Sequence, residues 1–297
     1  MSLPAFPRPD QALRIEGSVR SAGGIDIHFE RYTPPRPRST VMVLHGAGDH
    51  AGRYAGVTDA LVSAGHEVAL LDFRGHGRSG GRRWYVDRFE DYLSDLDAFA
   101  AKVRADAAGR KLFVVAHSQG GHIAAHWGIK GGKDVAGFVL SNPYFRLAID
   151  PPKVKIWTAL LVGKLIPHLP VDANLDLATL TSDPEMQAWS DADPLYQRKT
   201  TPRWFTESGR AQADLRRDMA RFDRPLLLLL GTGDRIADGA AASEFFAAIT
   251  SQDKELREYA GFEHEIFNER GRAAPIGDTV AWISQRSEPG KHAPGKH

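Results

Sequence analysis

The sequence contains no cysteine among its 297 residues. That absence excludes disulfide bonds, thiolate metal sites and a cysteine nucleophile. No stretch reaches the roughly 18 apolar residues of a membrane-spanning helix, so we expect no transmembrane segment. The N-terminal stretch MSLPAFPRPDQ has no basic segment followed by an apolar run. We therefore expect no secretory signal and a cytoplasmic protein.

Neither sign of charge dominates, because 38 Lys and Arg residues nearly balance 37 Asp and Glu residues. No long-range field would draw nucleic acid or an anionic membrane to this chain, so any membrane contact must come from a local patch. Hydrophobic residues make up 42% of the sequence and charged residues 25%, which is typical of a globular protein with a large core. At this length we expect one domain with an insertion.

Short apolar runs alternate with helical segments in the first half of the chain. The runs are typical of strands buried on both faces of a parallel sheet, and they cover residues 40–44, 67–71, 111–116 and 135–140. The intervening helical segments cover residues 54–64, 89–105 and 119–130. A hairpin of residues 13–20 and 25–32 is predicted before them. This alternation predicts an α/β fold with a mostly parallel central sheet and helices on both faces.

The alternation stops after Leu140 and resumes at Pro225. Between them the sequence carries Pro, Trp and helical patterns without a clear strand, which predicts an inserted cap of helices. A buried strand over residues 226–230, a helix near 240–249, a strand near 256–259 and a helix ending near Arg286 follow. We therefore predict a core in two parts, residues 1–144 and 223–286. Residues 145–222 form the predicted cap, and residues 287–297 form a predicted disordered tail.

Ser118 occupies a predicted junction between a strand and a helix. Residues 112–116 are expected to form the strand, His117-Ser118-Gln119-Gly120-Gly121 follows, and a helical pattern begins at once. This is the context of the G-x-S-x-G nucleophile elbow, which lifts the Ser hydroxyl above the sheet beside a helix N-terminus. Ala116 stands where the strict pattern has Gly. A Ser between small residues also suits a simple packing turn, so other segments must decide between the two interpretations.

A Ser hydroxyl needs a His that takes its proton and a carboxylate that orients that His. In enzymes with this elbow, the acid and then the His follow the Ser along the chain. Asp234 directly follows the predicted strand 226–230, at the edge of the sheet where such sites form. We favour it over the nearby Asp238, which suits a helix N-cap. His264 follows the predicted strand 256–259 and is the candidate base.

Acyl transfer also needs N–H donors for the oxyanion. One is expected from the residue after the nucleophile, the Gln119 N–H, and the other from a loop after an early strand. Ala47, in the loop His45-Gly46-Ala47-Gly48, is the candidate, and a packing turn is the alternative for this loop. His122 and His126 lie four apart on one predicted helix. A metal site there would need a third ligand that we cannot place, so we interpret them as surface or packing residues.

Five segments, in the expected order, resemble the monoacylglycerol lipase and lysophospholipase group of α/β-hydrolases. They are HGAGDHAGRY at 45–54, DFRGHGRSGGRR at 72–83, AHSQGG at 116–121, GTGDRIAD at 231–238 and GFEHEIFNE at 261–269. The resemblance implies the α/β-hydrolase fold with Ser118, Asp234 and His264 as the triad and Ala47 and Gln119 as oxyanion donors. It also implies a serine esterase of lipid metabolism that cleaves single-acyl-chain esters through an acyl-enzyme on Ser118, without metal or cofactor.

Members of this group carry a helical cap that forms a lipid-facing entrance. Within the predicted cap, Val154–Ile166 is strongly apolar with Lys at intervals. It is interpreted either as a helix that lines the acyl tunnel and transiently contacts a membrane, or as one that only packs on the core. The first interpretation makes the protein peripheral to the membrane.

Other functions remain open at this point. Related proline aminopeptidases use the same triad, and Glu185, Asp191 and Asp193 could hold a free amino terminus. A short-chain carboxylesterase and a non-catalytic binding protein are further alternatives. A haloalkane dehalogenase is excluded, because it would carry Asp in place of Ser118. Acyl length, headgroup and oligomeric state are not determined by the sequence.

Overall fold

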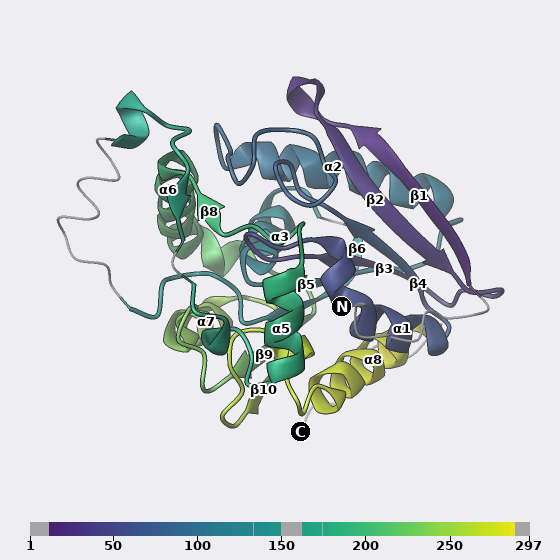
Figure 1. The fold of residues 1–297 in the computed structure, drawn as a ribbon. Coiled ribbons are helices and arrows are strands. Elements are labelled where there is room, and N and C mark those ends of the chain that lie inside the picture. The colour runs from purple at the N-terminus through teal and green to yellow at the C-terminus, as the bar shows by residue number, and fades with distance from the viewer. Residues whose placement is uncertain (1–11, 133, 150–161, 174, 289–297) are drawn as a thin grey trace.

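The computed structural model describes residues 12–132, 134–149, 162–173 and 175–288 (Figure 1). Their main feature is one eight-stranded sheet in the order β1-β2-β4-β3-β5-β6-β9-β10. The antiparallel pairs are β1 with β2 and β2 with β4, and all other neighbours are parallel. The strand bounds are β1 (Leu13–Arg20), β2 (Asp26–Thr33), β3 (Thr40–Leu44), β4 (Glu67–Leu71), β5 (Leu112–His117), β6 (Val135–Ser141), β9 (Leu226–Gly231) and β10 (Lys254–Tyr259). The predicted fold class is confirmed.

The central strands are buried on both faces, which explains their unbroken apolar runs. In β9, Leu226, Leu228 and Leu230 join the core on one side of the sheet, while Leu227 and Leu229 join the core on the other. β10 lies at the edge of the sheet and its residues are exposed or half-buried. Its sequence signal is weaker for that reason.

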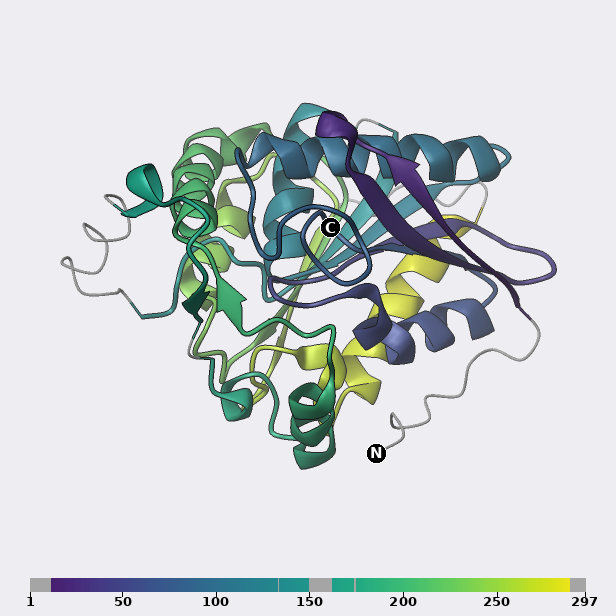
Figure 2. The same ribbon diagram turned by 45° about the horizontal axis from the view of Figure 1, so that its top comes forward.

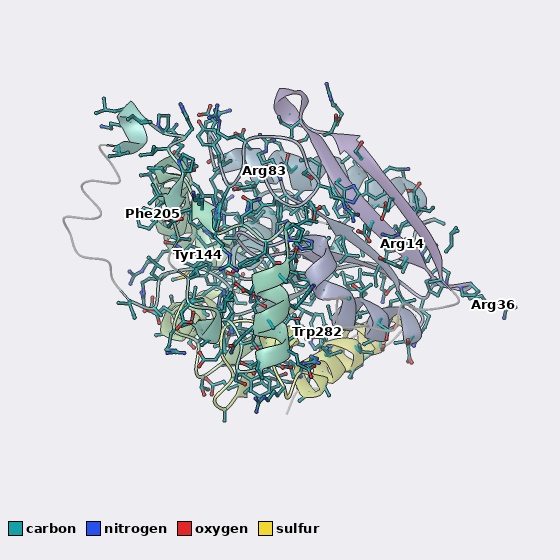
Figure 3. All side chains as sticks on the ribbon, viewed as in Figure 1. Arg14, Arg36, Arg83, Tyr144, Phe205 and Trp282 are labelled. Atoms are coloured by element: carbon teal, nitrogen blue, oxygen red, sulfur yellow. The ribbon has the colours of Figure 1, made fainter. Side chains whose placement is uncertain are left out.

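Helices cover both faces of the sheet (Figures 1 and 2). One face carries α2 (Glu90–Asp106), α3 (Gln119–Lys130) and α7 (Gly239–Ala248). The other carries α1 (Ala55–Ser63), which the short 3-10 helix Ala51–Tyr54 precedes, and α8 (Ala273–Ser287). Trp282 of α8, which is labelled in Figure 3, packs edge-on against Phe113 of β5, with ring centroids 6.3 Å apart. The predicted elements therefore form with their bounds shifted by only a few residues.

The segment predicted to form the cap, residues 145–222 and called the cap segment below, contains α5 (Pro184–Ala192) and α6 (Pro202–Asp218). Both helices begin with Pro after an N-cap side chain that accepts a backbone hydrogen bond. Two strands of two residues each, β7 (Val171–Asp172) and β8 (Lys199–Thr200), also pair here. The sequence did not predict them, because two residues are too few to show an alternating pattern.

Two predicted segments extend beyond the described residues. In Val154–Ile166, only residues 162–166 are described, and residues 162–165 are helical. The predicted tail begins inside α8, which runs to Ser287, and lies outside the described residues from 289 onward. Among the described residues, no helix is long and apolar enough to cross a membrane.

Candidate active site

Ser118 forms the sharp turn between β5 and α3. Its backbone has φ 51° and ψ −118°, a region that non-glycine residues rarely adopt and that costs about 1–3 kcal/mol. The turn requires glycine at two following positions. A Cβ on Gly120 would lie 2.5 Å from the His45 carbonyl oxygen, and one on Gly121 would lie 2.9 Å from Pro143. The small residues around Ser118 therefore let the helix pack close to the sheet.

His264 lies between Ser118 and Asp234. Its Nε2 is 2.8 Å from the Ser118 Oγ, and its Nδ1 is 2.7 Å from Oδ2 of Asp234. The other Asp234 oxygen accepts hydrogen bonds from the Ile236 and Ala237 N–H groups at 2.8 and 3.0 Å. The structure thus brings the three predicted side chains together from the loops that follow β5, β9 and β10.

Burial and neighbouring charges together set the protonation states of Asp234 and His264. Burial raises the pKa of the Asp234 carboxyl, but His264 and the two backbone donors outweigh it, so the pKa lies below its ordinary value. Burial also lowers the pKa of His264, and the Asp234 carboxylate outweighs that effect, so this pKa is raised. An ionised Asp234 therefore stabilises a protonated His264.

Asp238, the competing acid, lies at the start of α7. Its Oδ1 accepts a hydrogen bond from the Ala240 N–H at 2.8 Å, as an N-cap side chain does. Its other oxygen pairs with Arg146 at 2.7 Å. Asp238 therefore contacts the helix end and Arg146, whereas Asp234 contacts His264.

The loop after β3 packs directly on the nucleophile. A Cβ on Gly46 would lie 3.2 Å from the Ser118 Cβ, and Ala47 follows in the same loop. His45 holds this loop, because its Nδ1 is 2.7 Å from the Gly46 carbonyl and its Nε2 is 2.9 Å from the Phe73 N–H. Burial lowers the pKa of His45, so the ring is neutral and can accept from Phe73.

Gln119 is the first residue of α3. The first N–H groups of a helix have no acceptor within the helix. The two predicted oxyanion donors, Ala47 and Gln119, thus lie in segments that border Ser118 on two sides. This arrangement suits the stabilisation of negative charge next to the Ser118 hydroxyl.

Sequence reasoning missed Asn142, which joins three loops of the site. Its side-chain amide donates to the His264 carbonyl at 2.7 Å and to the Glu263 carbonyl at 3.2 Å, and its Oδ1 accepts from the Gly231 N–H at 2.8 Å. Its φ of 38° is one that Asn tolerates better than most residues. An Asn directly after a buried strand, at the edge that carries Ser118, was the available signal.

Arg53 was missed as well, although it is 1% exposed and central to the site. Its guanidinium pairs with Glu265 at 2.7 Å and with Asp49 at 2.8 Å, and it donates to Ser190 of α5 at 2.8 Å. Burial raises the pKa of Glu265, but Arg53 outweighs it and the pKa is lowered. Arg53 therefore joins the loop after β3, the cap segment and the neighbour of His264 through buried, compensated charges.

Glu185, Asp191 and Asp193 are the acidic residues of the cap segment that could hold a free amino terminus, and each has different surroundings in the structure. Asp193 accepts from Nε2 of His50 at 2.8 Å, and Asp191 pairs with Arg198 at 2.7 Å. Glu185 is exposed on α5. The structure does not bring these three carboxylates together in one cluster of contacts.

His122 and His126 are 0% and 3% exposed, so interpreting them as surface residues was wrong and interpreting them as packing residues was right. Their rings lie 5.1 Å apart, and the Phe89 ring lies within 5 Å of both. In the described parts of the chain, no group of three or more His, Asp or Glu side chains could hold a metal ion.

The similarity to known proteins extends over most of the chain. The family described as serine aminopeptidase, S33 (Hydrolase_4) matches residues 35–271. A monoacylglycerol lipase of Mycolicibacterium smegmatis is 33% identical over 91% of this chain and 97% of its own, and phospholipase YtpA of Bacillus subtilis is 29% identical over 80% and 92%. A soluble variant of Saccharomyces cerevisiae monoglyceride lipase, solved with a substrate analogue, is 25% identical, with a TM-score of 0.84 over 96% of this chain and 99% of that one.

Proposed function

This chain belongs to the Hydrolase_4 family of α/β-hydrolases and is a serine hydrolase, and from this premise we propose that it hydrolyses esters of a single fatty acyl chain. The observation that carries the proposal is the row Ser118, His264 and Asp234, joined by contacts of 2.8 and 2.7 Å. The substrate class follows from the similar proteins, which include a monoacylglycerol lipase and a phospholipase. Monoacylglycerols and lysophospholipids are the expected substrates.

In the proposed reaction, His264 removes the Ser118 proton as Oγ attacks the ester carbonyl. The N–H groups of Ala47 and Gln119 stabilise the negative charge that develops on the carbonyl oxygen. His264 then protonates the departing alcohol. Water, activated by the same His, next attacks the acyl-enzyme and releases the fatty acid.

A substrate panel tests this proposal. We expect kcat/KM for monooleoylglycerol or lysophosphatidylcholine to exceed that for p-nitrophenyl butyrate by about tenfold or more, because each buried methylene adds about 0.8 kcal/mol of binding. The measurement is initial rates across the panel at matched pH. Activity confined to the butyrate ester would contradict the lipase proposal and indicate a short-chain carboxylesterase.

An aminopeptidase is the second candidate, because the family description names that activity. Asp191 pairs with Arg198, and Asp193 pairs with His50. These contacts argue against a site in which the two carboxylates bind a free amino terminus. A prolyl substrate with a chromogenic amine belongs in the same panel. Amine release without ester hydrolysis would favour this candidate over the lipase.

We further propose that the cap segment contacts a lipid surface. Exposed apolar side chains flank residues 150–161 on both sides, with Ile149 73% exposed and Leu165 72% exposed. Ile166, Leu169 and Val171 are also exposed. Moving a fully exposed Leu or Ile into an apolar environment contributes about 1.5–3 kcal/mol, so a few such side chains suffice for weak, reversible binding.

The double variant Leu165→Asp, Ile166→Asp is expected to bind phosphatidylcholine vesicles about tenfold or more weakly than the wild type, because two apolar contacts are lost. Co-sedimentation measures this. Leu256→Asp, at an exposed apolar side chain on β10, is the matched control and should bind like the wild type. Equal binding by the double variant and the wild type would contradict the contact.

A further inference from the structure

The loop that carries His264 is closed by the side chain of Glu269. Oε1 of Glu269 accepts a hydrogen bond from the Glu263 N–H at 3.1 Å, and these two residues are six positions apart with His264 between them. Glu269 is 2% exposed, so its carboxylate lies in the interior of the protein. A carboxylate is costly to bury unless hydrogen-bond donors replace its water, so the donors around Glu269 fix its position.

The cap segment supplies two of these donors. The Ser182 N–H donates to Oε1 of Glu269 at 2.9 Å, and the Ser182 hydroxyl donates to Oε2 at 2.6 Å. The Arg270 N–H also donates to Oε2, at 3.3 Å. Hydrogen bonds to a carboxylate are stronger than those between neutral groups. Ser182 and the loop that carries His264 are therefore held together through one buried side chain.

Backbone hydrogen bonds join the same part of the cap segment to His264 and its neighbour. The Glu265 N–H donates to the Leu180 carbonyl at 2.7 Å. The His264 N–H donates to the Thr179 carbonyl at 3.4 Å, which is a longer and weaker bond. The cap segment thus runs alongside the loop that carries the catalytic base and contacts its backbone directly.

The backbone of this loop is held on two sides by different parts of the molecule. Asn142, directly after β6, donates to the carbonyls of Glu263 and His264. Glu269 and the cap segment instead accept from N–H groups of the same loop. With both kinds of backbone group bound, the loop holds the His264 ring at 2.8 Å from the Ser118 Oγ.

The position of this ring matters for the rate. Proton transfer to a base requires the two heavy atoms to lie within about 2.6–3.2 Å. His264 meets this requirement with Ser118 at 2.8 Å, and it lies 2.7 Å from Asp234. A displacement of about 1 Å can lower a rate about a hundredfold. Glu269 can therefore affect the reaction through His264 without touching the reacting atoms.

We propose that Glu269 is a positioning residue for His264 and that it acts together with Ser182, so that the cap segment takes part in catalysis by fixing the base. This inference rests on the proposed ester hydrolysis. It means that loss of Glu269 slows the chemical step for short and long acyl chains alike. A residue that only bound the acyl chain would affect long esters most, because they bury more methylene groups.

Two variants of Glu269 test the proposal. Glu269→Leu removes every acceptor, whereas Glu269→Gln keeps an oxygen that can replace Oε1 and accept from the Ser182 and Glu263 N–H groups. Both variants remove the charge, so the difference between them reports the hydrogen bonds. On p-nitrophenyl butyrate and on monooleoylglycerol, we expect Glu269→Leu to lower kcat about tenfold to a hundredfold, with KM changed by less than about twofold. Glu269→Gln should recover most of this loss.

The pH profile gives a second measurement that a purely structural role would not change. Asp234 raises the pKa of His264 through their contact. A displaced His264 loses part of that contact, so its pKa falls. The acid limb of kcat/KM should therefore lie at lower pH in Glu269→Leu than in Glu269→Gln. Coincident acid limbs in the two variants would contradict the proposal.

Asp183→Asn is the matched control. Asp183 follows Ser182 in the cap segment, is 8% exposed and pairs with Arg272 at 2.8 Å, beyond the loop that carries His264. Its Oδ1 also caps α5, and Asn can keep that role. Asp183→Asn should keep kcat within about threefold of the wild type, because one ion pair near the surface is lost and the contacts of Glu269 remain.

Unchanged kcat in a Glu269→Leu protein that is folded by circular dichroism overturns the inference. An equal loss in Glu269→Gln, or a rise in KM confined to the long ester, overturns it also. If Glu269→Leu does not fold, Ser182→Ala decides: it should lower kcat about twofold to tenfold at unchanged KM, and unchanged kcat overturns the inference.

The proposed function has a separate outcome. If the wild type reacts with a fluorophosphonate but hydrolyses no ester, ester hydrolysis fails as the function. The rate of Ser118 labelling, which also depends on His264 as a base, then decides the inference. It should fall in Glu269→Leu and largely recover in Glu269→Gln, and equal labelling rates in the wild type and Glu269→Leu would overturn it.

Discussion

Replacing Ser118 with Ala is expected to lower kcat for ester hydrolysis by about a million-fold, because the hydroxyl that forms the acyl-enzyme is lost. The hydroxyl lies 2.8 Å from Nε2 of His264, the only base that contacts it among the described residues. Residual activity would come from binding and the oxyanion donors alone. Rates on a long-chain ester and labelling by a fluorophosphonate both report this change.

Ser141 provides the control for that experiment. It is 0% exposed at the end of β6, and its hydroxyl contacts His117 at 3.2 Å without touching His264. Ser141→Ala should keep kcat within about tenfold of the wild type, since one hydrogen bond contributes about 0.5–1.5 kcal/mol. If Ser118→Ala still turned over and still reacted with the probe, Ser118 would not be the nucleophile. If the wild type failed to react, a non-catalytic binding protein would be the better interpretation.

Asp234→Asn is expected to lower kcat by about 10⁴-fold, because an amide can no longer hold His264 in the tautomer that accepts the Ser118 proton. The pH dependence should change as well. His264 must be unprotonated to act as a base, so kcat/KM falls as the pH drops through its pKa. The wild-type midpoint should lie above the ordinary His value of about 6.5, since Asp234 raises this pKa. Removing the carboxylate should move the midpoint to lower pH.

The competing acid offers a close control. Asp238→Asn removes charge only four residues away, where the side chain caps α7 and pairs with Arg146. It should leave the acid limb of the pH profile in place and lower kcat by less than about tenfold. An acid limb that moved in Asp238→Asn and stayed in Asp234→Asn would reverse the two assignments.

Local patterns explain why so much of the sheet was predictable. The runs that became β3, β4, β5 and β9 are apolar throughout because both of their faces are covered, and this property is visible within five or six residues. α3 begins at Gln119 and ends at Lys130 as predicted, since the turn at Ser118 and the helical period are both local features. The strands β7 and β8, at two residues each, had no such signal.

The sequence by itself determined the order of the candidate reactive residues along the chain. A Ser, an acid and a His each follow a predicted strand. The sequence favoured Asp234 over Asp238, which stands in the same loop, because Asp234 follows the predicted strand more directly. Only the tertiary structure distinguishes their contacts, because it places the Asp234 carboxylate 2.7 Å from His264 and the Asp238 carboxylate at the start of a helix.

The tertiary structure also decided the contacts of Arg53, Asn142 and His126. Arg53 and Glu265 are 212 positions apart in the chain, and His126 and the Ala211 carbonyl that it contacts are 85 positions apart. Burial and pairing at such separations depend on which surfaces pack together, which no local window of sequence contains. The sequence thus determined the elements and the candidate reactive groups, and packing decided which of those groups are charged, neutral or paired.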